Sequence, residues 1–330
     1  MRNSKLIIFT IFSSFIILFS SCIDDDGNLT TPPVLCNDVD YFGFRTDGMS
    51  NGSNTIEVVR NNNSNFNLTS FTSQTSFTYN GTIANNSATF DKNIQKMAFI
   101  DEWNIVEQLF VYDFGTNAVS VFPIAGSNRV TAPIFLNGTL YVLEKDSNTS
   151  DVSFKTLSLT GTLSTAVFTI PAATIGFLNP DTMNNLAYST TDGGDFLYFL
   201  LGGKLLTVDV TNPAAYTLKT MPNSHYLDIA YMQTGELLTV KNSGVSVDLM
   251  RLDISAATIT ETVEVAGLDI NPESVAIVYK ECGDRAHVLT HFVFGGANVV
   301  SKIHEVNVLT HTVISNDFSG WMFGFVHKEQ

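Results

Sequence analysis

The chain has 330 residues, of which 44% are hydrophobic and 15% charged, and it carries a formal net charge of −15. This length can bury a large core within one closed domain. An acidic chain with no cluster of Lys and Arg repels phosphate backbones, so nucleic acid is excluded as an expected partner.

The first residues predict export from the cell. Arg2 and Lys5 form a basic segment, an apolar run follows over residues 6–19, and Ser20-Ser21-Cys22 closes it with small residues. The run is about 14 residues long, whereas a stable membrane-spanning helix needs roughly 20. We therefore expect residues 1–21 to be a cleaved signal peptide.

This segment resembles the signal and lipobox of bacterial lipoproteins, in which a cysteine, here Cys22, is acylated and becomes the first residue of the mature chain. Phe19 departs from that pattern, because an aliphatic residue usually stands at its position. The resemblance implies that the chain associates with a membrane through several acyl chains on Cys22, which together give firm attachment.

An acidic run over residues 24–26 follows the lipobox. It resembles the surface-export signal of Bacteroidota lipoproteins, and a solvated acidic spacer is the alternative. We expect a lipid-anchored protein of the outer membrane that faces the cell exterior. Residues 22–36 would form a lipidated acidic tether, and residues 37–330 would form the folded domain.

Beyond the tether, one pattern recurs along the chain. Its clearest copy covers residues 205–220, where an alternating strand ends at Asp209, a Thr-Asn-Pro turn follows, and a second alternating strand begins. The matching positions are Val59, Asp113, Ser158, Asp209, Asp253 and Asn307. Units of about 50 residues have the size of a four-stranded propeller blade.

A second pattern, of small residues beside aromatic ones, precedes these turns and is expected to mark innermost strands, where blades crowd near the axis. Its copies are Met97-Ala98-Phe99, a poorer match at Pro133-Ile134-Phe135, then Leu186-Ala187-Tyr188, Ile229-Ala230-Tyr231, residues 275–279, and residues 321–325 at the end of the chain. The last copy has no turn after it, and the strand at residues 41–45 has no inner strand before it. We therefore expect the C-terminal strand to complete the blade begun by the N-terminal strands, which removes exposed sheet edges.

The predicted fold is all-β, a single β-propeller of about six blades. No helical periodicity appears outside the N-terminus. Seven blades is an alternative, because residues 72–93 have room for further strands, and a pair of β-sandwiches is another.

Two cysteines remain besides Cys22. Cys36 would lie just ahead of the second strand of the closing blade, and Cys282 between strands at residues 275–280 and 286–294 of the preceding blade. Both positions fall on the same face of neighbouring blades, and an exported protein meets an oxidising compartment, so we expect a disulfide between them. A nucleophilic cysteine is the alternative, but neither residue has the flanking pattern of a cysteine hydrolase.

Ligands of propellers usually meet the loops that enter the inner strands, at the mouth of the central channel. The candidate ligand-binding residues in these loops are Asp181, His225, Tyr226, Glu273, Asp317 and Trp321. Alternatively, the acidic residues hydrogen-bond loop amides and Trp321 packs near the axis. Glu102 and Trp103 form a further exposed candidate between strands.

No HExxH, Walker or GxGxxG pattern is present in the sequence, and enzymatic chemistry has no positive support there. His287 and His291 lie four apart on a predicted strand, about 13 Å, which is too far for one metal. We predict no catalytic residue, metal or cofactor.

The leading function is a non-enzymatic binding module for a glycan, a peptide or an envelope protein. The alternatives are a glycan hydrolase or lyase that uses carboxylates such as Asp181 and Glu273, and a structural or assembly subunit.

Overall fold

The computed structural model divides the chain into the units Met1–Asn37 and Asp38–Gln330, and every residue that it describes belongs to the second. The described residues are 40–46, 53–61, 71–80, 88–101, 107–126, 128–176, 190–192, 194, 196–201, 203–223, 225–232, 234–270, 272, 274–280, 284–294 and 298–328. The predicted signal peptide and tether lie outside them.

Strands dominate the second unit and form six antiparallel sheets of four strands each. From the inner to the outer strand, they are blade one, β24 (Trp321–Lys328), β1 (Asp40–Thr46), β2 (Ser53–Asn61) and β3 (Thr72–Asn80); blade two, β4 (Ala88–Asp91), β5 (Lys96–Asp101), β6 (Gln108–Asp113) and β7 (Ala118–Pro123); blade three, β8 (Arg129–Leu136), β9 (Thr139–Lys145), β10 (Val152–Leu157) and β11 (Phe168–Ile170); blade four, β12 (Thr190–Asp192), β13 (Phe196–Leu201), β14 (Lys204–Asp209) and β15 (Thr217–Thr220); blade five, β16 (Tyr226–Tyr231), β17 (Leu237–Asn242), β18 (Val247–Asp253) and β19 (Thr260–Asp269); and blade six, β20 (Ser274–Lys280), β21 (Arg285–Phe294), β22 (Asn298–Asn307) and β23 (Thr312–Ser319).

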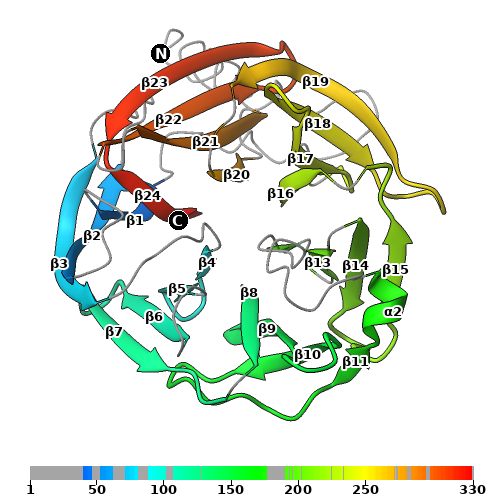
Figure 1. Ribbon diagram of the computed structural model, residues 1–330. Helices are drawn as coiled ribbons and strands as arrows, with labels where there is room; N and C mark the ends of the chain where they lie inside the picture. Colours follow the sequence, from blue (N-terminus) through cyan, green and yellow to red (C-terminus); the bar gives the residue numbers. More distant parts are fainter. Residues whose placement is uncertain are drawn as a thin grey trace, which may run out of the picture. The chain divides into compact units, whose positions relative to one another are not determined.

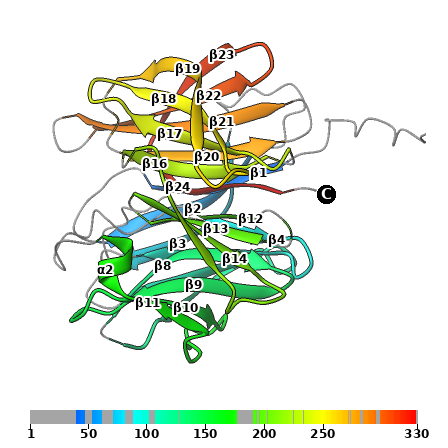
Figure 2. The ribbon, with the colours of Figure 1, turned by 90° about the vertical axis from the view of Figure 1, so that its right-hand side faces the viewer.

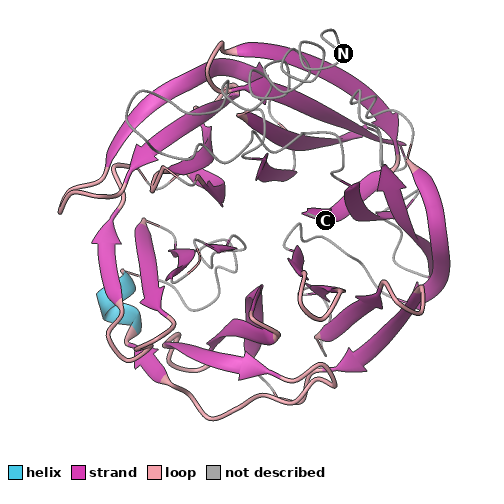
Figure 3. Ribbon diagram, turned by 180° about the vertical axis from the view of Figure 1, so that it is seen from behind, coloured by secondary structure: helices cyan, strands magenta, loops and turns pink. Residues whose placement is uncertain are grey.

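The six sheets follow one another around a ring (Figure 1), and each inner strand contacts the inner strands of both neighbouring blades. The unit is a six-bladed β-propeller. The alternatives of seven blades and of two sandwiches are therefore wrong. Figure 3 shows α2 (Ala172–Ile175), a single helical turn, among the strands at the rim. None of the described helices is long and apolar enough to cross a membrane.

The place of a strand within its blade explains its hydrophobic pattern. Middle strands have neighbours on both faces, and β13 is buried from its second residue onward. Outer strands face solvent, and in β7 exposed residues are interspersed with partly buried ones, with none fully buried. Continuous apolar runs and alternating runs are the expected patterns for these two environments.

Aromatic rings fill much of the space between blades. The ring of Phe154 in blade three is fully buried, stacks on Tyr141 at 5.3 Å and on Phe168 at 5.2 Å, and meets Phe199 of blade four edge-on at 5.8 Å. Such pairs stabilise a core beyond the apolar area that they bury. The seam between these blades is thus held by side-chain packing.

Blade one confirms the predicted closure. β24 pairs with β1 in antiparallel register from Asp40 opposite Lys328 to Thr46 opposite Trp321. The inner strand therefore comes from the end of the chain and the other three strands from its beginning.

Most of the predicted inner strands are confirmed, namely those in β8, β16, β20 and β24. The prediction for Met97-Ala98-Phe99 is wrong, because these residues lie in β5, the second strand of blade two, and its inner strand is β4. A second strand is buried on both faces and accepts the same small and aromatic residues. Leu186-Ala187-Tyr188 lies outside the described residues.

The recurring turn follows the third strand of each blade. In five blades, the side chain at the marked position accepts hydrogen bonds from backbone amides further along: Asp113 from Gly115 and Thr116, Ser158 from Thr160 and Thr162, Asp209 from Thr211, Asp253 from Ser255, and Asn307 from Leu309 and Thr310. Short polar side chains favour turns by this bond. In blade one the third strand ends at Asn61, so the match at Val59 was two residues early.

Candidate functional site

The predicted ligand-binding loops belong to one face of the propeller. Each blade has an even number of antiparallel strands, so its outer strand ends at the face where the next inner strand begins; β19 ends at Asp269, for example, and β20 begins at Ser274. We call this the top face and the opposite one the bottom face. Figure 2 shows the blades from the side.

His225 and Tyr226 lie at the start of β16 but differ in exposure. The His225 side chain is exposed, and its backbone carbonyl accepts a hydrogen bond from the Asn242 amide at 2.8 Å. The Tyr226 side chain is buried, and its hydroxyl donates to the carboxylate of Glu261, which also accepts from Lys241 Nζ at 2.7 Å. Burial raises the pKa of Tyr226, and the Glu261 carboxylate raises it further. His225 is thus the member of this pair that presents a side chain to solvent.

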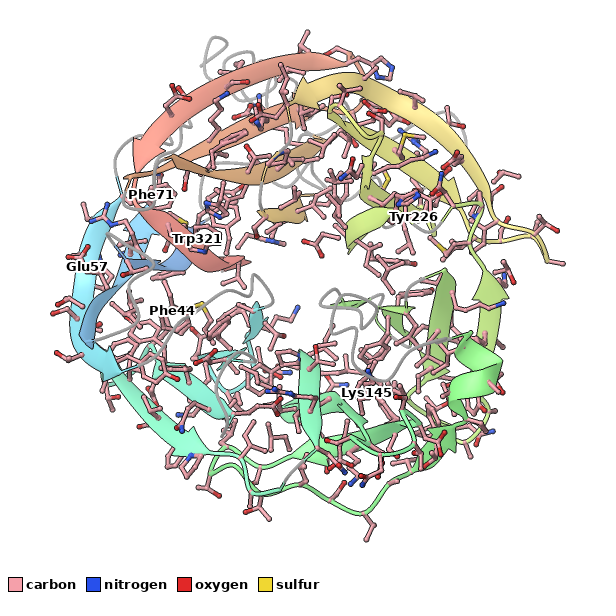
Figure 4. All side chains as sticks on the ribbon, viewed as in Figure 1. Phe44, Glu57, Phe71, Lys145, Tyr226 and Trp321 are labelled. Carbon is pink, nitrogen blue, oxygen red and sulfur yellow. The ribbon has the colours of Figure 1, made fainter. Side chains whose placement is uncertain are left out.

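Trp321 is the first residue of β24, and its side chain is 2% exposed. Its ring stacks on His291 of blade six, with ring centroids 4.6 Å apart and planes 10° apart. His291 Nδ1 lies 2.5 Å from Ser301 Oγ, whose hydroxyl donates to the carbonyl of Gly320. Trp321 therefore occupies the seam between blades six and one, which favours a packing role (Figure 4).

The environment of the His291 imidazole keeps it uncharged. Burial lowers the pKa of His291 to about 3, against the opposing effect of the Met322 backbone. At neutral pH the stacked pair of His291 and Trp321 is therefore a neutral contact. Trp321 Nε1 is buried without a hydrogen-bond partner among the described residues.

Asp317 does not lie in a loop. It is an exposed residue of the outer strand β23 and is paired in register with Lys302 of β22. Gly320 alone separates β23 from β24, with a φ of 90°, and a Cβ atom there would lie 3.0 Å from the carbonyl oxygen of Thr46. Asp317 therefore belongs to a strand and not to the loop that the sequence predicted, since a single residue joins β23 to β24.

The other predicted site residues lie outside the described part of the chain. They are Asp181 and Glu273, the anchor Cys22, the cysteine pair Cys36 and Cys282, and the loop residues Glu102 and Trp103. The role of Asp181 and Glu273 as ligand-binding or catalytic carboxylates, the lipid anchor and the disulfide remain predictions.

Exposed aliphatic residues lie, like His225, at the top face of blade five. Val245 is 71% exposed, Ile270 is 70% exposed and Leu227 is 37% exposed. The turn that carries Val245 follows Asn242, which bonds His225, and Val247 is paired with Asp269, the residue before Ile270. We call His225, Leu227, Val245 and Ile270 the blade-five patch. The sequence signal of this patch is weak, because its three aliphatic residues are single apolar side chains that are far apart in the chain.

The top face of blade two carries a different kind of group, made of buried acidic residues and their partners. Glu107 is 5% exposed, accepts a hydrogen bond from the Val130 amide at 2.6 Å, and lies 3.7 Å from Arg129. Burial raises the pKa of Glu107 to about 8, although the Val130 amide and Arg129 oppose the rise. Nearby, the Asp101 carboxylate accepts from the Tyr79 hydroxyl. These contacts connect blades one, two and three, and Glu107 carries a proton at neutral pH.

A metal centre is not indicated by the described residues, in which no group of three or more His, Cys, Asp or Glu side chains is arranged to hold an ion. The top face therefore offers, within the described ranges, exposed aliphatic and imidazole groups on blade five and buried acids on blade two.

Comparison with known proteins gives the fold. No family model matches the sequence, and no curated protein matches it. TolB from Acinetobacter baumannii superposes with a TM-score of 0.53 at 13% identity, over 88% of this chain and 66% of the TolB chain. A protein from Lactobacillus plantarum superposes with a TM-score of 0.52 at 9% identity, over 88% of this chain and 99% of the other. These likenesses show a propeller fold alone.

A further similar structure is the virginiamycin B lyase from Staphylococcus aureus, with a TM-score of 0.45, 12% identity, and coverage of 83% of this chain and 84% of the lyase. That likeness is too low to bear on activity. Because one fold supports unrelated functions, the function has to be argued from this propeller's own surface.

Proposed function

We propose that the chain is an outer-membrane lipoprotein, anchored through Cys22 and displayed on the cell exterior, whose propeller binds a protein or peptide of the cell envelope through the top face. The observation that carries the binding role is the blade-five patch. The resemblance of residues 1–26 to lipoprotein signals supports the anchor and the display.

The chemistry of the patch favours a protein or peptide over a glycan. Val245 and Ile270 are aliphatic and about 70% exposed, each on a turn that strand pairing holds in place. Glycan sites usually need exposed aromatic faces, and Tyr226 and Trp321 are both buried. Aliphatic side chains gain most from apolar surface on the partner. Each Å² of apolar surface that is removed from water stabilises the complex by about 25 cal/mol.

Site-specific photo-crosslinking in the native cell tests the binding role. A photo-reactive amino acid at position 245 should give one defined cross-linked product. Position 309 provides the matched control, because Leu309 is 67% exposed and aliphatic but lies in the turn after β22, on the bottom face. The product at 245 should weaken at least tenfold when Ile270→Asp is added, since a charge would be buried at the contact.

Equal products from positions 245 and 309, or no product from 245, would contradict the binding surface. If position 245 is cross-linked to a glycan, the ligand of this surface is a glycan and not a protein or peptide. The hydrolase or lyase alternative would instead need turnover that is lost on replacing Asp181 or Glu273.

Protease treatment of intact native cells tests the display. Peptides of residues 40–328 should be released from wild-type cells, and Cys22→Ala should remove the protein from the membrane fraction. If the anchored protein resists protease until the outer membrane is broken, it faces the periplasm, and the assembly role becomes the better account.

A further inference from the structure

The seam between blades five and six contains an acid, an imidazole and a hydroxyl in a row. Asp269 ends β19, His304 lies in β22, and Ser315 lies in β23. Asp269 Oδ2 is 3.1 Å from His304 Nε2, and His304 Nδ1 is 2.8 Å from Ser315 Oγ. In Figure 1, β19 and β23 follow one another along the outside of the ring, with the arrowhead of β19 near the start of β23.

From this arrangement we infer that Asp269, His304 and Ser315 form a nucleophilic triad that cleaves neutral carboxylic esters on the outer rim of the propeller. This activity is distinct from the binding role proposed above and uses none of the four patch residues, although Asp269 directly precedes Ile270. Triads of this type are recognised by geometry and roles, because they recur on unrelated folds in different chain orders.

A nucleophilic triad needs a buried acid and base and an accessible hydroxyl, and the three side chains differ in exposure in this way. Asp269 is 7% exposed and His304 is 2% exposed, whereas Ser315 is exposed. Thr290 Oγ1 donates to Asp269 Oδ2 at 2.8 Å, and Lys302 Nζ lies 3.3 Å from Asp269 Oδ1. The acid and imidazole are therefore fixed in place, and the hydroxyl can meet a large substrate from solvent.

The protonation states also suit a general base. Burial disfavours the charged form of Asp269, but bonds from Thr290 and the Ile270 amide, with His304 and Lys302 nearby, outweigh it and hold the pKa of Asp269 below its ordinary value. Burial lowers the pKa of His304, although Asp269 and Asp317 raise it again and Lys302 adds to the lowering. At neutral pH the carboxylate is charged and the imidazole is neutral. With His304 Nε2 donating to Asp269, its Nδ1 can accept the Ser315 proton.

The reaction balances without a cofactor. Ser315 Oγ bonds to the ester carbonyl carbon while its proton moves to His304 Nδ1. The bond to the leaving alcohol then breaks, and the alcohol oxygen takes that proton. Water next attacks the acyl-enzyme, His304 accepts its proton, and the proton returns to Ser315 Oγ as the carboxylic acid leaves. β23 is the outermost strand of its sheet, so every second amide along it points away from the sheet and can stabilise the oxyanion.

The surroundings of Ser315 favour neutral substrates. Residues two apart on a strand share a face, so Val313 and Asp317 flank Ser315. Val313 is 38% exposed and can contact an acyl chain. The carboxylate of Asp317 repels anionic substrates.

A fluorophosphonate probe tests the triad on the full-length protein in detergent. We expect one adduct per chain, mapped to Ser315 by mass spectrometry, and at least a hundredfold slower labelling of Ser315→Ala. Ser120→Ala is the matched control, because Ser120 is also an exposed residue of an outer strand, and it should label like the wild type. Asp269→Asn should slow labelling by roughly 10² to 10⁴.

The pH profile of wild-type labelling separates a nucleophile from a structural hydroxyl without any variant. The rate should fall as the pH drops and His304 is protonated. Absence of an adduct, equal labelling of Ser315→Ala, or a rate that does not fall at any pH at which the protein stays folded would overturn the inference. Ser315 is exposed, so its replacement leaves the fold intact even if the buried variants do not fold. The photo-crosslink at position 245 should be unchanged in Ser315→Ala.

Discussion

At the inner end of blade one, a missing side chain sets how closely two blades approach. Gly324 has a φ of 65°, and a Cβ atom there would lie 2.9 Å from Ala88 Cβ and 3.1 Å from a ring carbon of Phe44. Any other residue would meet both the backbone strain of the left-handed region and these neighbours. The closing strand therefore depends on glycine at this position.

Gly324→Ala should lower the free energy of unfolding by roughly 2 to 5 kcal/mol, from about 1 to 2 of backbone strain and about 1 to 3 of overpacking. Gly244→Ala is the control, since Gly244 has a φ of 95° with nothing within 4 Å of its Cβ position. It should lose only the strain. Urea unfolding measures both, and equal losses would show that the contact with Ala88 does not matter.

Glu107 gives the stability of the protein a dependence on pH. The pKa of Glu107 is about 8 in the folded chain, where burial raises it from its ordinary 4.5. Between these values the folded chain holds a proton that the unfolded chain has released. Unfolding thus releases a proton, and the free energy of unfolding falls as the pH rises, by at most about 1.4 kcal/mol per pH unit.

Glu107→Gln should remove that slope between pH 5 and 8, because the amide is uncharged at every pH and still accepts from Val130. Unfolding in urea at three pH values measures it. Glu261→Gln is the control: burial of Glu261 is outweighed by bonds from Lys241 and Tyr226, which lower its pKa below that window. A slope that survives in Glu107→Gln would contradict the assignment.

At the scale of the elements, the turn after the third strand is the best-encoded part of each blade. The Asn307 side chain accepts from the amides of Leu309 at 3.0 Å and Thr310 at 2.9 Å. Both donors lie within three residues of Asn307, so the local sequence alone determines whether these hydrogen bonds can form. This is why the repeat could be found without a structure.

Asn307→Ala should lower the free energy of unfolding by about 1 kcal/mol, the size of one turn or cap bond. Asn307→Asp keeps the oxygen acceptor and should lose less than half of that. Thermal and urea unfolding compare the two variants. A loss of the same size in both would mean that the amide NH₂ group, and not the oxygen, stabilises the turn.

Features that depend on distant residues could not be predicted from the sequence. Asp269 and His304 are separated by 35 residues, and neither has a motif around it. Likewise, whether Trp321 faces the channel or packs on His291 depends on how blade six meets blade one. The inner strand of blade two was missed because its four residues, Ala88–Asp91, are too short for a periodic pattern. Turn hydrogen bonds within a few residues and the alternation of apolar and polar residues were enough to predict the propeller. The candidate sites depend on contacts between blades, which the local sequence does not encode.

At the scale of the whole domain, β24 completes both blade one and the ring. Its side chains Trp321, Met322, Phe325 and Val326 are all at most 6% exposed. At about 1.5 to 3 kcal/mol for each buried apolar side chain, their burial is comparable with the 5 to 15 kcal/mol of a typical domain's net stability. Without β24, β1 would also become an unpaired edge.

A chain that ends at Gly320 should therefore lose cooperative unfolding and aggregate. Circular dichroism during heating and size-exclusion chromatography measure this. A chain lacking only residues 329–330 is the control and should behave like the full-length protein. A cooperative transition at an unchanged midpoint in the shorter chain would show that five blades and an open edge suffice.

The pairing of β1 with β24 also has a consequence for the order of events during synthesis. The first strands of the domain leave the ribosome long before the strand that they need as an inner neighbour. Until then the ring cannot close, and the early strands remain available to other binding proteins. Under the export proposed above, secretion machinery would have the whole period of translation in which to capture the chain before the native state forms.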